Sequence, residues 1–247
     1  MSLYDMMDIL QLSCMGHKGG YIAYSQGASP TANVIAATPY TAGGICQALA
    51  AKWIVQHAND DSLWNWLYLP GTRTINKGCI LQLMHNFIDG VARDGRSARH
   101  ANPTTRFKYP LGMTYQDYVT ERYMGLFGVK RRQMVANSFL GNQHHMIGTG
   151  NDGYCLANRL RESFLNAKGG SYVLIVIKGS YQNEPVGHAM SAFVGETDIA
   201  FFDPNFGEFW FPTKDDFTAW FRGYWSTSEY NTIFRNFYLL PYGKAAW

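Results

Sequence analysis

The chain has 247 residues, enough for one large hydrophobic core or for two small domains. Apolar residues make up 47% and charged residues 16%, a composition that excludes an intrinsically disordered chain. The formal net charge of +3 gives little support for a polyanionic partner, and we expect no nucleic-acid partner. The longest apolar run, Tyr172–Ile177, is far too short to span a membrane.

The N-terminal part of the sequence favours helices. A short helix is predicted over 3–12, and the rest of 1–38 is interpreted as an irregular lead-in rich in Gly, Ser and Ala. From 44 to 57 the apolar residues recur at helical spacing. The residues predicted to share the inner face of this helix are Cys46, Leu49, Ala50, Trp53, Ile54 and His57.

A second long helix is predicted over 76–91, and the stretch 89–112 that follows contains Gly, Pro, Asn and Arg without any periodicity. We interpret 89–112 as a surface loop insertion, and loops of this length are often functional. A capping-box pattern at Thr114 and Asp117 predicts a third helix. The stretch 151–170 predicts a further helix.

The last third of the sequence favours strands, with one short helix at 213–225. Helices followed by antiparallel strands are typical of the α+β class, in which a helical layer packs on a sheet. Because no linker interrupts the chain, we expect a single domain over 1–247. The predicted strands are 171–179, 187–194, 199–203, 208–211 and 232–240.

The candidate nucleophile is Cys46, at the start of the predicted helix 44–57. A thiol attacks only as its thiolate, and the ordinary thiol pKa is about 8.5. The N–H groups and the dipole of a helix N-terminus lower that pKa, while Gly43 and Gly44 leave space in front of the sulfur. A cysteine in a helical pattern is more often a buried small apolar residue, so this stretch alone does not identify a nucleophile.

A histidine and an aspartate in neighbouring strands supply candidate partners for the thiol. A hairpin that turns about Gly195 and Glu196 sets His188 directly opposite Asp203 on one face of the sheet. Asp203 is then expected to accept a hydrogen bond from one imidazole nitrogen and to leave the other nitrogen for Cys46.

Three blocks of the sequence resemble the YopT/AvrPphB family of papain-like cysteine proteases: GGICQALAAKW, GHAMSAFV and FFDPNFGEF. The resemblance implies a papain-like α+β fold in which a helical subregion carries the nucleophile and an antiparallel sheet carries the histidine and the aspartate. It implies a cysteine endopeptidase with Cys46 as nucleophile, His188 as general base and acid, and Asp203 as the residue that orients His188. Residues 204–208 also resemble the family, and we expect them to hold the turn after Asp203.

Members of that family are bacterial effectors or toxin modules, so the resemblance implies a protein or peptide substrate in a host or recipient cell. Asp5 and Asp8 stand where a signal peptide needs basic and apolar regions, so secretion is expected to be independent of a signal peptide. A secretion chaperone or an immunity protein is a candidate partner. No cofactor and no metal are expected.

Acyl transfer also requires donors for the developing oxyanion, and the loss of one donor costs about 3–4 kcal/mol of transition-state stabilisation. The backbone N–H of Cys46 is one candidate. Papain-like enzymes add a side-chain amide just upstream, but Thr41 stands there, and we take it as the second candidate. Asn33 is an alternative, and Gln47 is expected to point elsewhere.

The same three residues serve papain-like peptidoglycan amidases and endopeptidases, glutamine deamidases and transglutaminases, so these activities remain open. A non-enzymatic binding module is a further alternative, and it predicts an unreactive Cys46. Cys155 also follows small residues near a helix start and is a weaker candidate nucleophile. His144 and His145 lack a third metal ligand at a usual spacing, so we interpret them as a loop pair.

Overall fold

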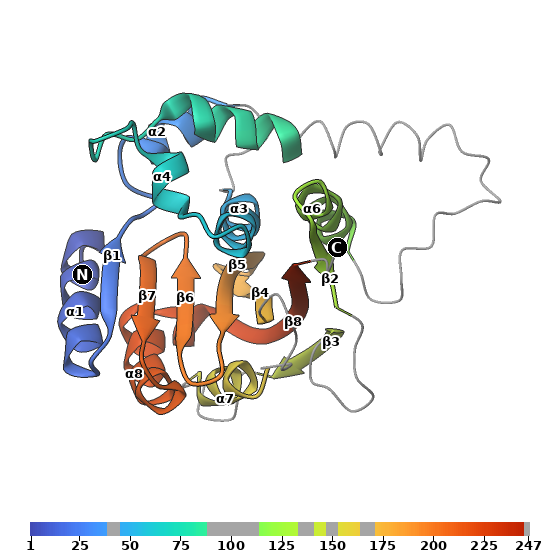
Figure 1. Cartoon of the computed structure of the whole chain (residues 1–247). Helices are drawn as coiled ribbons and strands as arrows, with labels where there is room; N and C mark the ends of the chain where they lie inside the picture. The colour runs from blue at the N-terminus through green and yellow to red at the C-terminus, as the bar shows by residue number, and fades with distance from the viewer. Residues whose placement is uncertain (39–44, 88–113, 133–140, 147–152, 164–170, 245–247) are drawn as a thin grey trace.

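The centre of the molecule is an eight-stranded antiparallel sheet in the order β1-β7-β6-β5-β4-β8-β2, with β3 paired to β8 (Figure 1). The computed structural model describes residues 1–38, 45–87, 114–132, 141–146, 153–163 and 171–244. The strands are β1 (Gly20–Ala23), β2 (Val129–Arg131), β3 (Gly141–Met146), β4 (Ser171–Tyr181), β5 (Glu184–Val194), β6 (Ile199–Asp203), β7 (Gly207–Phe211) and β8 (Phe234–Lys244).

Helices cover both faces of this sheet. One face, which we call the α3 face, packs against α3, α4, the helical residues 77–87 and α6, and the opposite face, the α8 face, packs against α1, α7, α8 and α9. The labelled helices are α1 (Leu3–Gly16), α2 (Thr31–Ala36), α3 (Cys46–Ala58), α4 (Leu63–Leu67), α6 (Tyr115–Gly125), α7 (Tyr154–Arg161), α8 (Lys214–Thr227) and α9 (Tyr230–Ile233).

The central strand β4 shows how the two faces are filled. Leu174 and Val176 belong to the core of the α3 face, whereas Val173, Ile175 and Ile177 belong to the core of the α8 face. Because successive side chains of a strand point to opposite faces, a strand buried on both faces becomes a continuous apolar run. The predicted α+β fold, with a helical layer on an antiparallel sheet, is confirmed.

The predicted lead-in over 1–38 is more regular than the sequence suggested. The first helix extends to Gly16, and Ser2 and Asp5 form a capping box at its start. The expectation of irregular structure is wrong for β1, which pairs with β7, and for α2. β1 has only four residues, most of them exposed at the edge of the sheet, so it leaves no apolar alternation in the sequence.

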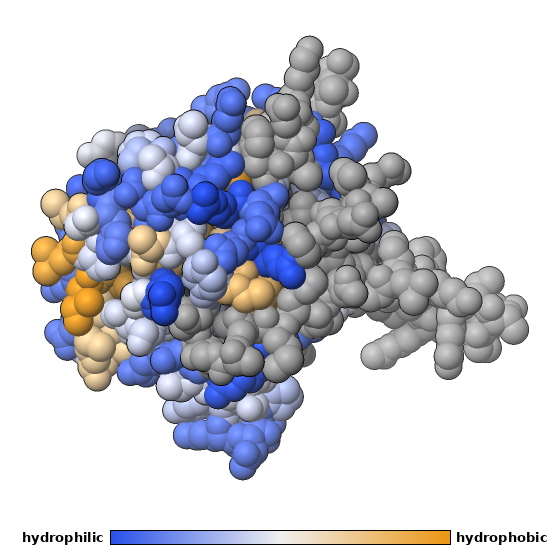
Figure 2. All heavy atoms as spheres, turned by 90° about the horizontal axis from the view of Figure 1, so that it is seen from below, coloured by the Kyte–Doolittle hydropathy of each residue, from blue (hydrophilic) through white to orange (hydrophobic). Residues whose placement is uncertain are grey.

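The outer surface of α1 carries exposed apolar side chains at Tyr4, Ile9, Leu12 and Met15. Figure 2 shows apolar residues gathered at the edge of the molecule where α1 lies. No helix within the described ranges has the length and apolarity that a membrane crossing requires.

Two other predictions concern His144 and His145, which lie in β3, and the predicted loop 89–112. The backbone of His144 and His145 lies in β3, so their interpretation as a loop pair is wrong. Pairing to β8 forms this strand, and the polar sequence of 141–146 gives no sign of it. The predicted loop 89–112 lies outside the described residues.

The observed register of β5 against β6 differs by two residues from the predicted register, because the turn between the two strands is longer than predicted. Val194 pairs with Ile199, and the N–H of Gly195 donates to the carbonyl of Asp198 over 3.0 Å. His188 is therefore not directly opposite Asp203, as predicted from a tighter turn. Since the period of a strand is two residues, a slip of two leaves both side chains on the face that was expected.

Candidate active site

Cys46 is the first residue of α3, and its side chain is half-buried. Its contacts are the imidazole of His188 and the backbone N–H groups of Gln47 and Ala189. The Gln47 N–H is one of the donors that the start of a helix leaves without an intrahelical partner. The last β5–β6 pair is Ser191↔Phe202, so the ladder ends before Ala189 and leaves its N–H for the sulfur.

These contacts stabilise the thiolate of Cys46. Burial by itself raises the pKa of a thiol, but the hydrogen bond and the charge of His188 outweigh it, and the two backbone N–H groups add to their effect. The net result is that the pKa of Cys46 is lowered. Cys14 shows the opposite case, because burial alone raises its pKa to about 12.

His188 holds the position between the thiol and the carboxylate. It lies in β5 with only 6% of its surface exposed, and its Nε2 is 2.7 Å from Asp203 Oδ1. The other ring nitrogen, Nδ1, is left for the sulfur of Cys46. Burial lowers the pKa of the imidazole, but the charge of Asp203 and the hydrogen bonds to Asp203 and Cys46 raise it to about 10.

Asp203 ends β6 and is fully buried. Its Oδ1 accepts from His188 and from the backbone N–H of Asn205, the latter over 2.7 Å. Its Oδ2 accepts a short hydrogen bond from the Tyr224 hydroxyl and a second one, 2.9 Å long, from Tyr230. Burial raises the pKa of Asp203, but the charge of His188 and these donors outweigh that effect and lower it.

The turn after Asp203 has the structural role that the sequence suggested for 204–208. The N–H of Phe206 donates to the carbonyl of Asp203 over 3.0 Å, which closes the turn between β6 and β7. Gly207 follows with φ +110°, and a Cβ there would collide with the carbonyl of Ile22 in β1. Glycine at this position therefore lets the edge strand approach the Asp203 turn.

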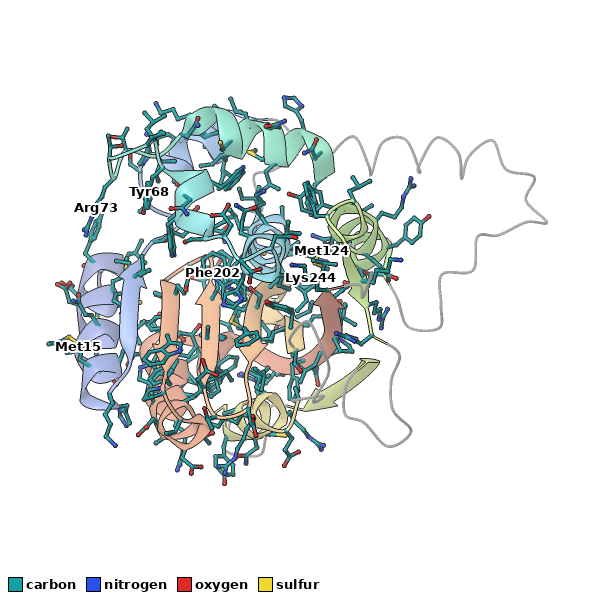
Figure 3. The ribbon with its side chains drawn as sticks, viewed as in Figure 1. Met15, Tyr68, Arg73, Met124, Phe202 and Lys244 are labelled. Carbon is teal, nitrogen blue, oxygen red and sulfur yellow. The ribbon has the colours of Figure 1, made fainter. Side chains whose placement is uncertain are left out.

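Glu208 attaches α3 to the sheet. Its Oε2 accepts from the indole of Trp53 in α3 over 3.0 Å and from the indole of Trp64 in α4 over 2.9 Å. The ring of Phe202, beside Asp203, lies parallel to Trp53 with centroids 6.1 Å apart, between β6 and α3 in Figure 3. The helix that carries Cys46 is thus fixed to the strands on either side of the Asp203 turn.

The side chain of Gln47 points away from the candidate active site, as predicted. Its Nε2 donates to Asp117 Oδ1 and to Thr120 Oγ1 in α6, over 3.2 and 3.0 Å. Asp117 is also the partner of Thr114 in the predicted capping box, which is confirmed, and it accepts from the hydroxyl of Tyr238. These contacts fix the start of α3 against α6.

Gln26 is a residue of the site that the sequence did not indicate. It lies between β1 and α2, where its Oε1 accepts from the N–H of Ile45 over 3.1 Å and its Nε2 donates to Asn205 Oδ1 over 2.8 Å. Gln26 is twenty residues before Cys46, so no local spacing connects the two. Asn33, which was an alternative oxyanion donor, instead donates to Ser29 Oγ, and Thr41 lies outside the described residues.

The remaining candidates from the sequence have ordinary surroundings. Cys155 packs in α7 against the core of the α8 face. His57 stacks on Phe193 with ring centroids 4.8 Å apart, and its Nδ1 is 3.0 Å from the Tyr172 hydroxyl. Among the residues that the structure describes, no three His, Cys, Asp or Glu side chains are grouped in a way that could hold a metal ion.

The chain is similar to known proteins in both sequence and fold. Residues 158–237, which include His188 and Asp203, match the Peptidase C58 family model, described as Yersinia/Haemophilus virulence surface antigen. The cysteine protease yopT1 of Yersinia enterocolitica is 30% identical over 194 residues, which cover 77% of this chain and 53% of the relative. The protein adenylyltransferase and cysteine protease IbpA of Histophilus somni is 27% identical over 199 residues, or 77% of this chain and 4% of the relative.

The fold has a counterpart among solved structures. The avirulence protein AvrPphB of Pseudomonas superposes with a TM-score of 0.52 at 13% identity, over 97% of this chain and 99% of AvrPphB. At this identity the likeness supports the papain-like fold. This chain spans about half the length of the Yersinia relative, 53%. Together, the family model, the relatives and the fold show that the chain belongs to the YopT/AvrPphB family of papain-like cysteine proteases.

Proposed function

We propose that the chain is a cysteine endopeptidase in which Cys46 is the nucleophile, His188 the general base and acid, and Asp203 the residue that orients His188. The observation that carries the proposal is the continuous hydrogen-bonded array from Cys46 through His188 to Asp203. Within it the thiol pKa is lowered and the imidazole pKa is raised, so the pair favours the thiolate with the imidazolium over the neutral thiol with the neutral imidazole.

The reaction follows from the positions of these groups. The Cys46 thiolate attacks the carbonyl carbon of the scissile peptide bond, and His188 then gives its proton to the leaving amine as the acyl-enzyme forms. His188 next takes a proton from a water molecule, whose oxygen attacks the acyl carbon and releases the second product. Asp203 stays ionised throughout and stabilises the imidazolium.

The oxyanion that develops on the carbonyl oxygen needs hydrogen-bond donors at the N-terminus of α3. The backbone N–H of Cys46 is suited to this role, because the first N–H groups of a helix have no intrahelical acceptor. We keep Thr41 as the proposed second donor. A Thr41→Val variant that cleaves substrate as fast as the wild type would exclude that role.

We further propose that the chain acts as an effector or toxin module on a protein of a host or recipient cell after secretion that needs no signal peptide. The family assignment and the relatives named as cysteine proteases support this proposal. A thiolate also requires a reducing compartment, which the cytosol of a target cell provides. A secretion chaperone or an immunity protein is the proposed partner, and the domain assignment of 1–247 as one catalytic unit is part of the same proposal.

The test compares wild type, Cys46→Ala and His188→Ala on proteins of a eukaryotic or bacterial lysate, with new N-termini identified by mass spectrometry. Cleavage by the wild type should fall by about 10⁴-fold or more in either variant, because the nucleophile and the base act as a unit. Circular dichroism of both variants controls for folding.

The alternatives give different products in the same experiment. Released ammonia without new N-termini indicates a glutamine deamidase, and incorporation of an added amine indicates a transglutaminase. Soluble muropeptides from purified sacculi indicate a peptidoglycan hydrolase. If none of these products depends on Cys46, the chain is a binding module and the protease proposal is wrong.

A further inference from the structure

Six side chains and one backbone N–H form a closed hydrogen-bonded circuit around the candidate active site. Starting at the residue before Cys46, the Ile45 N–H donates to Gln26, and Gln26 Nε2 donates to Asn205 Oδ1. Asn205 Nδ2 then donates to the Tyr230 hydroxyl over 2.8 Å, and that hydroxyl donates to Asp203. Asp203 binds His188, and His188 binds Cys46, which completes the circuit.

The direction of every hydrogen bond in the circuit is fixed by its two ends. The backbone N–H of Ile45 can only donate, so Gln26 must turn its carbonyl oxygen toward Ile45 and its NH₂ group toward Asn205. Asn205 must then present its oxygen to Gln26 and its NH₂ group to Tyr230. At the other end the ionised Asp203 can only accept, and Tyr230 supplies its own proton.

Gln26 is the member of the circuit that joins its two halves. Ile45 and Cys46 belong to the α3 side, whereas Asn205 and Asp203 belong to the turn between β6 and β7. Gln26 is itself held in place, because its backbone N–H donates to the carbonyl of Pro204 over 2.7 Å and its side chain is buried. A buried amide that is bonded at both ends is rigid, and its length therefore sets the spacing between the two halves.

We propose that Gln26 is a positioning residue that fixes the start of α3 relative to the Asp203 turn and keeps the Tyr230 hydroxyl directed at the Asp203 carboxylate. It touches neither the sulfur nor the imidazole in this role. Its effect reaches them through the Cys46 backbone on one side and through Tyr230, Asp203 and His188 on the other. This positioning role of Gln26 rests on the proposed protease function.

The decisive measurement is the rate at which iodoacetamide labels Cys46, mapped by mass spectrometry across pH 5 to 10. Gln26→Met keeps the size of the side chain and removes both hydrogen bonds. With a loosened circuit, the Cys46 pKa should rise by about one unit, so the labelling profile moves to higher pH by that amount. Labelling at pH values below the pKa then slows by up to about tenfold, while labelling near pH 10 stays unchanged. Gln56→Met is the matched control, since Gln56 lies in α3, the helix of Cys46, and its side-chain amide donates to Asp61 on the exposed surface.

A double-mutant cycle with Tyr230→Phe tests the route. If Gln26 acts through Tyr230, Gln26→Met slows labelling less in the Tyr230→Phe background than in the wild type, and the two effects do not add. Asn205→Ala provides a second route if Gln26→Met does not fold, because it removes the partner of Gln26 and should produce the same shift of the labelling profile.

Several outcomes would overturn the inference. A labelling profile of Gln26→Met equal to that of Gln56→Met excludes a positioning role, as does a fall in thermal stability without a change in the profile. Fully additive effects in the cycle exclude the route through Tyr230. No substrate is needed for any of these measurements, so failure of the protease proposal, seen as absence of Cys46-dependent cleavage, is distinguishable from failure of this inference.

Discussion

On the α3 face, directed polar contacts hold the helix that carries Cys46: Glu208 binds two indoles, and Gln47 binds Asp117 and Thr120. On the α8 face, the contacts are mainly between aromatic rings of β6, β7 and α8, such as Phe209 and Trp220 with centroids 4.6 Å apart. Tyr224 and Tyr230 belong to that aromatic layer, and only their hydroxyls are polar, both bound to Asp203.

This difference separates two tasks. The helix that carries Cys46 must be placed at a set angle and distance, and hydrogen bonds between a few groups fix both, because they are directional. The Asp203 carboxylate must stay ionised in a buried site, which requires rigid surroundings without water and hydrogen-bond donors directed at its two oxygens. We therefore expect mutations on the α8 face near Asp203 to alter reactivity, and mutations on the α3 face to alter stability first.

The largest effect is expected for Asp203→Asn. The amide removes the charge that raises the pKa of His188 and favours the wrong imidazole tautomer. Cleavage should fall by on the order of 10³–10⁴-fold. Cys46 labelling at pH 6 should fall by up to about 300-fold, the loss expected if a fully ionised thiol returns to its ordinary pKa of about 8.5, while circular dichroism remains that of a folded chain. Full activity of Asp203→Asn on a genuine substrate would show that the carboxylate does not orient the base.

The aromatic packing of the α8 face is tested by Phe217→Ala. Phe217 is fully buried, and its ring packs among those of Phe201, Phe211 and Phe221. Removing the ring should lower the free energy of unfolding by about 3–5 kcal/mol, measured in urea. The pH profile of Cys46 labelling should not move. If it does move, packing and reactivity on this face are not separable.

The polar contacts of the α3 face are tested by the pair Glu208→Leu and Glu208→Gln. Leucine leaves two indole N–H groups without an acceptor, so we expect a loss of about 2–3 kcal/mol. Glutamine keeps one acceptor oxygen, and burial already raises the pKa of Glu208, so its loss should be less than about 1 kcal/mol. Equal losses for the two variants would mean that packing, not hydrogen bonding, holds α3.

The smallest effect is expected in the pH dependence of stability. In the folded chain the pKa of His188 is about 10, whereas in the unfolded chain it is near 6.5. The stabilisation that comes from the charged His188 is therefore lost as the pH rises from about 6.5 to 10. The lowered pKa of Cys46 acts in the opposite direction up to its unfolded value of about 8.5.

The two contributions offset each other below that point, and the His188 contribution is left between about pH 8.5 and 10. Over this interval the wild type should lose about 1–2 kcal/mol more than His188→Ala, measured by urea unfolding at each pH. Parallel curves for the two proteins would show that the imidazole is not held in its charged form.

Much of the fold could be predicted because long elements repeat a period. The apolar residues of α3, of β4 and of the strands 199–203 and 208–211 recur often enough to identify type and approximate bounds. The register of β5 against β6 could not be predicted, because it depends on the loop at 195–198. The prediction still kept His188 and Asp203 on one face, since the error was an even number of residues.

The sequence by itself determined which reactive groups are present and on which elements they lie. These are a thiol at the start of an amphipathic helix, an imidazole and a carboxylate on neighbouring strands, and a glycine in the turn after Asp203. Only the tertiary structure decided how these groups are held. Gln26 meets Ile45 and Asn205, Glu208 meets Trp53, and Tyr230 meets Asp203, each across a separation that no local period records. The physical reason is that a hydrogen bond between distant segments depends on where the sheet and the helices bring their side chains, and it leaves no periodic pattern in the sequence.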